Sequence, residues 1–256
     1  MFSKKLSGTL AFALMAIVPV AAHAGGTAFP PPQFCDGTLA TIVGDENANT
    51  LVGQAGVADV IVGLGGNDRI AGLGGDDLIC AGDGDDIVRA GDGDDTVFGG
   101  DGDDTIRAGR GADRVHSGPD DDVVRGEGGD DTFLHGDIGN DNISGGPGQD
   151  DLFGDDGEDN LSGGAGVDFV HGGVENDRLA GGPGNDSLFG DAGNDLLRAG
   201  TGDDVRVYGN DGDDRLDGGP GNDDDCQGAP DADGDGAPDV GADGVVDADL
   251  TRRCEV

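Results

Sequence analysis

Basic and aromatic side chains are scarce in this 256-residue chain, which has 14 lysines and arginines together, one tyrosine and no tryptophan. Against 54 acidic residues this gives a formal net charge of −40. Nucleic acid is therefore excluded as a default partner, because binding a phosphate backbone needs patches of arginine and lysine. Hydrophobic residues make up 34% of the chain, below the roughly 45–50% of ordinary globular domains. The chain is either disordered or stabilised by bound cations.

The motifs of common catalytic sites are missing too. His116, His135 and His171 sit in three different repeat units, with no HExxH motif, no nearby cysteine and no GxSxG nucleophile elbow. A phosphate-binding P-loop needs a lysine, and lysine occurs only at Lys4 and Lys5. We therefore predict no catalytic residues and no enzymatic activity.

Residues 1–24 have the pattern of a secretory signal peptide. Lys4 and Lys5 precede an apolar run over residues 10–22, and Ala22-His23-Ala24 is a small-x-small cleavage site. The alternative is a membrane anchor, but the run is shorter than the ~20 residues that a span needs, and no later segment could span a bilayer. We predict secretion after cleavage near Ala24, to an extracellular setting where disulfides persist.

A proline-rich lead over residues 25–43 is followed by a nine-residue period over residues 44–226. Twenty units can be counted, and those that begin at residues 53, 135 and 199 carry ten residues. Position 4 is glycine in 17 units, position 6 is aspartate in 19, and position 8 is Ile, Val, Leu or Phe in 19. Such self-similarity predicts a solenoid.

The spacing also predicts a chemistry. Glycines at positions 1, 2 and 4 allow a tight turn with exposed carbonyls, and the position-6 carboxylate closes that turn. Positions 7–9 are predicted to form a three-residue strand with position 8 facing inward, because strands alternate faces. Carbonyl and carboxylate oxygens are the ligands of hard divalent cations, and a flexible backbone cage suits Ca²⁺ better than Mg²⁺.

The units Gly99-Gly-Asp-Gly-Asp-Asp-Thr-Ile-Arg107 and Gly181-Gly-Pro-Gly-Asn-Asp-Ser-Leu-Phe189 match the pattern GGxGxDxUx. The chain thus resembles the RTX, or haemolysin-type, calcium-binding repeat family. The resemblance implies an all-β, right-handed parallel β-roll with two nonapeptides per coil. It also implies Ca²⁺ between the turns of successive coils, at most about 18 ions for twenty units in two rows. The ligands carried over are the position-6 carboxylates: Asp59, Asp68, Asp77, Asp86, Asp95, Asp104, Asp113, Asp122, Asp131, Asp141, Asp150, Asp159, Asp168, Asp177, Asp186, Asp195, Asp204, Asp214 and Asp223.

An acidic tail follows over residues 227–256. Asp231, Asp233, Asp235 and Asp239 are spaced like the first half of an EF-hand calcium loop, but the place of its last acid is taken by Ala242. An isolated calcium loop and a disordered acidic tail are both open readings. In either case the tail is predicted to help cap the solenoid.

Four cysteines in a secreted chain allow three pairings. Cys35 lies before the repeats and Cys80 ends the fourth unit, while Cys226 ends the repeats and Cys254 nearly ends the chain. We predict the pairs Cys35–Cys80 and Cys226–Cys254, which tie each flank to one end of the solenoid, since solenoids need their ends covered.

Two units per coil predict two different outward faces at position 9. One face is polar and basic, and the other is rich in aromatic rings. That face is either a ladder of stacked rings that strengthens the sheet or a surface for a protein, a glycan or a second copy. The basic face carries Arg89, Arg107, Arg125, Ser144, Ser162, Ala180 and Arg198, and the aromatic face carries Phe98, His116, Leu134, Phe153, His171, Phe189 and Tyr208.

The sequence therefore predicts an extracellular calcium-binding β-roll that folds on binding Ca²⁺, without catalysis, nucleic acid or a membrane span. The alternative is a structural or adhesive surface protein, or a mineral-interacting one, that uses the calcium-stiffened rod as a platform. Mineral binding needs carboxylates left free by calcium, for which Asp83, Asp92 and Asp101 at position 3 are candidates.

Overall fold

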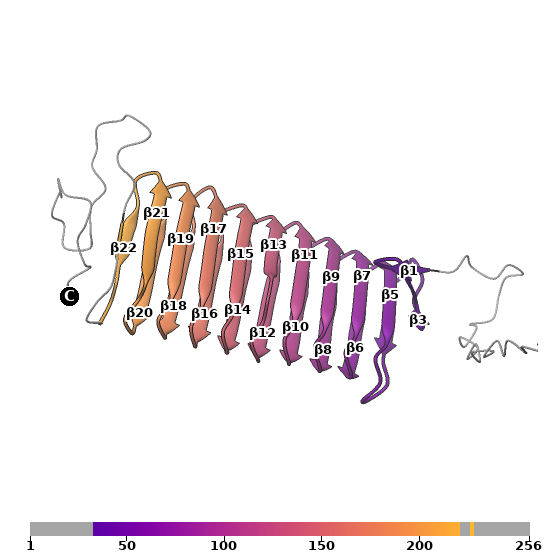
Figure 1. Cartoon of the computed structure of the whole chain (residues 1–256). Coiled ribbons are helices and arrows are strands. Elements are labelled where there is room, and N and C mark those ends of the chain that lie inside the picture. The colour runs from indigo at the N-terminus through magenta and orange to yellow at the C-terminus, as the bar shows by residue number, and fades with distance from the viewer. Residues whose placement is uncertain (1–32, 221–225, 228–256) are drawn as a thin grey trace, which may run out of the picture.

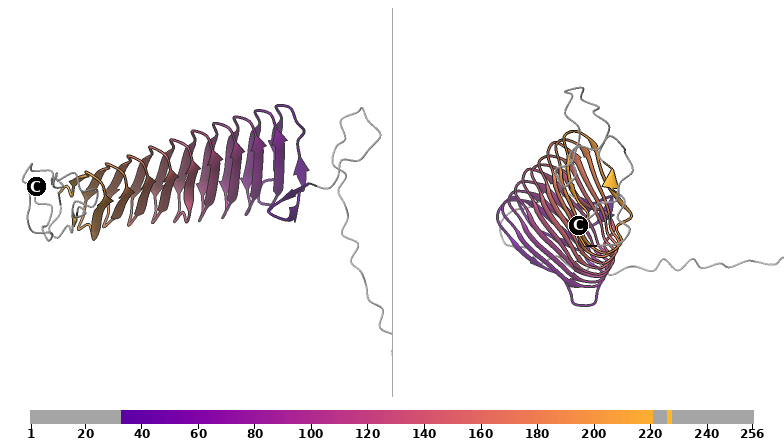
Figure 2. Two further views of the ribbon diagram at one scale, coloured as in Figure 1. Left: turned by 90° about the horizontal axis from the view of Figure 1, so that it is seen from above. Right: turned by 90° about the vertical axis from the view of Figure 1, so that its left-hand side faces the viewer.

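The chain winds into a rod of stacked coils. The computed structural model describes residues 33–220 and 226–227 (Figure 1). Successive strands alternate between two sheets, one of ten strands and one of eleven, and each strand pairs in parallel with the strand two places along the chain. Two repeat units therefore form one coil, and the predicted all-β parallel β-roll is confirmed. Figure 2 shows the rod from above and from its end, where the coils nest with a gradual twist.

The two sheets comprise almost all of the regular structure. The even-numbered sheet contains β4 (Thr50–Val52), β6 (Arg69–Gly74), β8 (Ile87–Asp92), β10 (Thr105–Arg110), β12 (Val123–Gly128), β14 (Asn142–Pro147), β16 (Asn160–Ala165), β18 (Arg178–Pro183), β20 (Leu196–Thr201) and β22 (Arg215–Asp217). The odd-numbered sheet contains β3 (Ile42–Val43), β5 (Val60–Gly65), β7 (Leu78–Asp83), β9 (Thr96–Asp101), β11 (Arg114–Pro119), β13 (Leu134–Ile138), β15 (Asp151–Asp156), β17 (Phe169–Val174), β19 (Ser187–Ala192), β21 (Arg206–Asp211) and β23 (Cys226–Gln227).

Most strands are twice as long as the repeat pattern predicts. A typical strand has six residues and covers positions 7–9 of one unit and positions 1–3 of the next, as β9 does. The prediction of three-residue strands was wrong because pairing between coils continues past position 9, as in the register of β7 with β9, which runs from Leu78↔Thr96 to Asp83↔Asp101. Glycine at positions 1 and 2 does not interrupt this pairing.

The core is a stack of aliphatic side chains from position 8. Along β9 burial alternates, with Val97 and Gly99 inside and their neighbours on the outer face. The inward direction of position 8 is thus confirmed. Position 1 also faces inward but carries only glycine, alanine or serine, so each unit adds little apolar mass. The fully or nearly buried position-8 residues include Ile61, Ile70, Ile79, Val88, Val97, Ile106, Val115, Val124, Leu134, Ile143, Leu152, Leu161, Val170, Leu179, Leu188, Leu197 and Val207.

Where glycine stands at position 2, both backbone conformation and space favour it. Gly100 has a φ of 120°, a region that side chains disfavour. A Cβ built on Gly100 would also collide with the carbonyl oxygen of Gly82 in the preceding coil. At Gly82 and Gly100 the backbones of successive coils therefore approach too closely for a side chain on Gly100.

One ten-residue unit differs from its predicted boundaries. The extra residue lies between Asp131 and Leu134, so the long unit spans residues 126–135 and the next begins at Gly136. Leu134 therefore takes the buried position-8 place, in register with Val115, and His135 takes position 9. The exposed Phe133 forms the irregularity, with a φ of 64°.

A small hairpin packs against β5 and β7 near the N-terminal end of the roll. β1 (Phe34–Cys35) pairs with β2 (Thr38–Leu39) in antiparallel fashion. The predicted disulfide between Cys35 and Cys80 is confirmed, with a Cα–Cα distance of 5.7 Å, and it attaches this hairpin to β7. Cys254 of the predicted Cys226–Cys254 pair lies outside the described residues, and so do the signal peptide and the tail from residue 228.

The Cys35–Cys80 bond should stabilise the first coils. It joins residues 45 positions apart, and closing a loop of that size restricts the unfolded chain by about 4 kcal/mol in the chain-entropy model. The double substitution C35S/C80S should therefore lower the denaturant midpoint of the calcium-loaded protein and increase amide exchange in β1, β5 and β7 first. An unchanged exchange rate in these strands would contradict this role.

Candidate metal centres

The position-6 aspartates stand in two rows, one along each row of turns. Each precedes a strand, and the side chains from Asp59 to Asp214 are at most 3% exposed. Within a row, Oδ1 of each aspartate from Asp68 onward accepts a hydrogen bond from the backbone N–H of the position-6 residue in the preceding coil, which is Asn49 for Asp68 and an aspartate for the others. Both rows share this pattern, at N···O distances of 2.6–3.0 Å; in one row, for example, Asp86 donates to Asp104 and Asp104 to Asp122.

In most of these carboxylates the second oxygen faces the interior of the turn, although Asp59 Oδ2 accepts a hydrogen bond from Gln54 N. Within the described part of the chain, the buried Oδ2 atoms of Asp86, Asp95 and Asp104 have no hydrogen-bond partner, and most position-6 aspartates share this feature. A Cβ built on Gly99 would collide with Asp104 Oδ2 on one side and the carbonyl oxygen of Ser117 on the other. Acceptor oxygens thus converge there, an arrangement that needs a cation, since a buried unpaired carboxylate oxygen is costly.

Burial raises the pKa of these carboxyl groups. Loss of water is the largest cause, and the charges of neighbouring aspartates add to it, while the backbone N–H from the preceding coil acts in the opposite direction. The pKa rises to about 6 for Asp86, about 7 for Asp95 and about 8 for Asp104. Asp141 and Asp177 also reach about 8. In the folded chain without metal, these carboxyl groups therefore bind protons at a higher pH than ordinary aspartates do.

The donor set fits calcium. Carboxylate Oδ2 atoms and turn carbonyls are hard oxygen ligands of the kind that Ca²⁺ binds in groups of six to eight. When bound, the ion supplies positive charge between turns where the chain itself has only acceptors. The structure brings together all the predicted ligands from Asp59 to Asp214. Asp223 and the loop formed by Asp231, Asp233, Asp235 and Asp239 lie outside the described residues.

A second row of side-chain hydrogen bonds, made by exposed position-5 residues, runs beside the buried aspartate rows. It was not predicted from the sequence. Position 5 is usually Asp, Asn, Glu or Gln, and its side-chain oxygen accepts the backbone N–H of position 5 in the next coil. Asp121 Oδ1 accepts from Asn140 N at 2.8 Å, and Asn140 Oδ1 accepts from Glu158 N at 3.0 Å. The recurrence of these residue types at position 5 was the available signal. This second row ties the turns together from outside.

The position-3 candidates for mineral binding do not form one row. Asp83 and Asp101 are paired neighbours on the odd-numbered sheet, whereas Asp92 belongs to the even-numbered sheet. All three are exposed. Asp92 also lies 3.6 Å from Arg110, so part of its charge is balanced.

The two outward faces differ as predicted, with one correction. Arg89, Arg107 and Arg125 stack in register on the even-numbered sheet. On the odd-numbered sheet, Leu134 was wrongly placed on the aromatic face: it is buried, and His135 stands in its place because of the extra residue before it. The aromatic stripe therefore consists of Phe98, His116, His135, Phe153, His171, Phe189 and Tyr208.

The rings of the aromatic stripe stack on one another. Centroids of successive rings lie 4.5–5.6 Å apart, and from Phe98 to Phe189 their planes are inclined by only 6–17°. Phe133 and Phe169 lie beside the stripe and contact it. Because the flat faces of the rings already contact each other, they are not available for stacking against a sugar. The geometry favours a ladder that strengthens the sheet.

The chain belongs to the family that these features indicate. The family model for the RTX calcium-binding nonapeptide repeat (4 copies) matches residues 56–88, 81–115, 98–133, 135–170, 171–205 and 206–224. These matches contain repeats only, with no catalytic domain. No curated protein matches the chain. Among the described residues, none forms a helix that is long and apolar enough to cross a bilayer.

Without calcium, folding should be favoured by acid. The pKa of Asp104 is higher in the folded chain than the ordinary value of 3.8 for aspartate, so the folded state binds more protons, and its stability falls as pH rises from about 4 to about 8. Circular dichroism of calcium-free protein should show more β-sheet at pH 4 than at pH 8. Sodium chloride added at pH 8 only screens charge, so it should restore less β-sheet than lowering the pH to 4 does. A β-sheet signal that grows with pH in calcium-free buffer would contradict the expectation.

The stacked rings should contribute to stability. Phe153 contacts rings on both sides, from His135 and His171, and each such pair is worth about 0.5–1.5 kcal/mol. The F153A/F189A variant should therefore lose stability in calcium without a change in sedimentation behaviour. If self-association disappears while calcium-induced folding is intact, the stripe is instead a contact surface.

Proposed function

We propose that the protein is an extracellular calcium-binding β-roll that folds when Ca²⁺ occupies its turns, and that it has no catalytic activity. The observation that carries the proposal is the buried Oδ2 of the position-6 aspartates, which has no donor in residues such as Asp95 and Asp104. Membership of the RTX calcium-binding repeat family supports it.

Calcium would act mainly by removing repulsion. The chain has a net charge of −40 and buries carboxylates next to one another along both rows. Only one large apolar side chain per unit opposes this repulsion. Because each turn site lies between two coils, filling one site orders the next, and binding should be cooperative. The expected affinity per site is roughly 10⁻⁴–10⁻³ M, as in extracellular calcium modules.

An extracellular location is supported by the Cys35–Cys80 disulfide, since such bonds persist in oxidising compartments. It also agrees with the predicted signal peptide over residues 1–24. Calcium in the millimolar range outside cells would keep weak sites filled, whereas a reducing cytoplasm would remove the disulfide.

A structural or adhesive platform is the alternative role. The partly exposed cluster of Phe169, Phe189 and Tyr208 favours it, because apolar surface on a stiff rod can hold a protein or a second copy. This role adds a partner to calcium binding and does not replace it.

The calcium proposal can be tested with two adjacent aspartates. Asp104 is buried at position 6, and Asp103 is exposed at position 5. D104N keeps the Oδ1 acceptor for Asp86 N–H and changes only the oxygen that faces the turn. D103N makes the same change of charge one residue away.

Calcium titrations followed by circular dichroism should show folding of the wild type with Ca²⁺ and less with Mg²⁺. D104N should need a clearly higher calcium concentration, whereas D103N should stay near the wild type. β-sheet that persists unchanged in excess chelator at pH 8, or equal midpoints for the two variants, would refute the proposal.

A further inference from the structure

Each histidine of the aromatic stripe is paired with an aspartate of the next coil. His135 Nδ1 lies 2.6 Å from Asp155 Oδ2, and His171 Nδ1 lies 2.7 Å from Asp191 Oδ2. His116 Nδ1 lies 3.5 Å from Asp137 Oδ2, which is an ion-pair contact without a hydrogen bond.

These aspartates stand at position 2, where glycine is the commonest residue of the repeat. In the coil that follows the stripe residues Phe98 and Phe153 the corresponding residues are Gly118 and Gly173, and in the coil that follows Phe189 it is Asn210. Asp137, Asp155 and Asp191 adopt left-handed backbone conformations with φ of 68°, 73° and 74°. Such conformations are unfavourable for residues other than glycine and are often found at functional sites.

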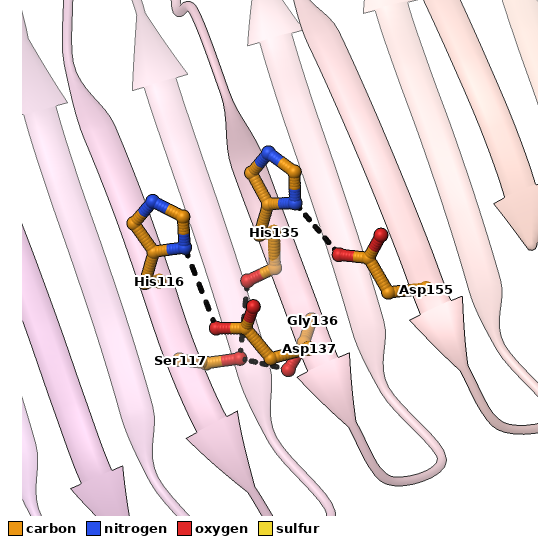
Figure 3. Close-up of polar contacts among 6 residues, drawn as sticks. All are labelled: His116, Ser117, His135, Gly136, Asp137 and Asp155. Atoms are coloured by element: carbon orange, nitrogen blue, oxygen red, sulfur yellow. Dashed lines mark hydrogen bonds and ion pairs between the residues drawn. The ribbon is translucent and has the colours of Figure 1, made fainter.

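His116 and His135 are neighbours in the stripe, whereas His171 has no histidine beside it. Among the three histidine–aspartate pairs, side chains of two pairs therefore come together only at His116 and His135. His116 and His135 are in register on β11 and β13, with ring centroids 4.8 Å apart. Asp137 lies on the same strand as His135 and reaches toward His116 (Figure 3). The three half-buried side chains each place a possible ligand atom within 4.8 Å of the other two.

From this geometry we infer that His116, His135 and Asp137 form a site for one transition-metal ion of the type that prefers imidazole, such as Zn²⁺, Ni²⁺ or Cu²⁺. Two imidazoles and a carboxylate are a common ligand set for these ions. The turns, in contrast, offer oxygen only. The site lies on the outer face of a sheet, apart from the position-6 rows, and it depends on the fold and not on the calcium proposal.

The spacing and orientation of the groups support this assignment. Two ligand atoms on one tetrahedral ion lie about 3.4 Å apart, close to the 3.5 Å between His116 Nδ1 and Asp137 Oδ2. Asp155 holds His135 with Nδ1 as the donor, which leaves Nε2 with a free electron pair, as carboxylates do for histidine ligands in metal proteins.

The backbone beneath the site is also held in place. The Ser117 hydroxyl donates to the carbonyl oxygen of Gly136 at 2.8 Å and of His135 at 3.2 Å (Figure 3). Ser117 is fully buried and occupies a position that is otherwise glycine or alanine. It therefore links β11 to β13 at the residues that carry the two imidazoles, which supports a preformed site.

The test uses the full chain without a histidine tag, saturated with calcium so that the turns are filled. Isothermal titration with Zn²⁺ should show one site per chain. H116N and H135N should each weaken binding by at least about tenfold, and D155N by roughly tenfold as a positioning residue. H171N is the matched control: it removes a histidine with the same kind of aspartate partner but no histidine neighbour, and binding should stay unchanged.

Electron paramagnetic resonance with Cu²⁺ gives a readout that folding defects cannot imitate. Wild type and H171N should show coupling to two nitrogens, and H116N and H135N to fewer, while circular dichroism confirms that each variant is folded. The inference is overturned if no stoichiometric site appears, if H116N and H135N bind like the wild type, or if H171N weakens binding as much as they do.

Discussion

The structure depends on the burial of one carboxylate in every repeat. Oδ1 of each position-6 aspartate is hydrogen-bonded to the preceding coil, as Asp104 is to Asp86, so the row fixes the spacing and register of the turns. Oδ2 is left facing other oxygens. The same side chain thus connects successive coils through Oδ1 and requires a cation at Oδ2. Hydrophobic burial alone is small here, because position 8 is the only large inward side chain of a unit.

Much of this arrangement can be predicted from the sequence because the repeat is close to exact. A fixed nine-residue period makes every coil alike, so parallel stacking, the inward position 8 and the position-6 rows follow from a single unit. The Cys35–Cys80 bond also follows from the need to cover an end. Strand length does not follow, since pairing through the glycines of positions 1 and 2 depends on the close approach of neighbouring backbones.

The local irregularities could not be predicted in the same way. An extra residue can be placed anywhere in a ten-residue unit, and only the packing of Leu134 between Val115 and Leu152 decides that Phe133 is the one displaced. The pairing of stripe histidines with aspartates is also hidden in the sequence, because His135 and Asp155 are 20 residues apart. The pairing becomes visible only once it is known that a coil holds two units and which residues of successive coils are in register. Position 9 of one coil can then be compared with position 2 of the next.

The roll therefore separates two kinds of metal chemistry by residue position. Positions 4–6 form turns of oxygen ligands that suit calcium, and the left-handed conformation there falls on the position-4 glycine, such as Gly102, which accepts it freely. On the outer face, positions 9 and 2 carry imidazole and carboxylate, and the left-handed conformation is imposed on Asp137 and Asp155 at some cost. Left-handed residues other than glycine also occur at position 2 away from the histidines, for example Leu64, Leu73 and Asn210. What distinguishes this part of the outer face is therefore the meeting of two imidazoles and a carboxylate at His116, His135 and Asp137, a combination that stacked rings alone would not require.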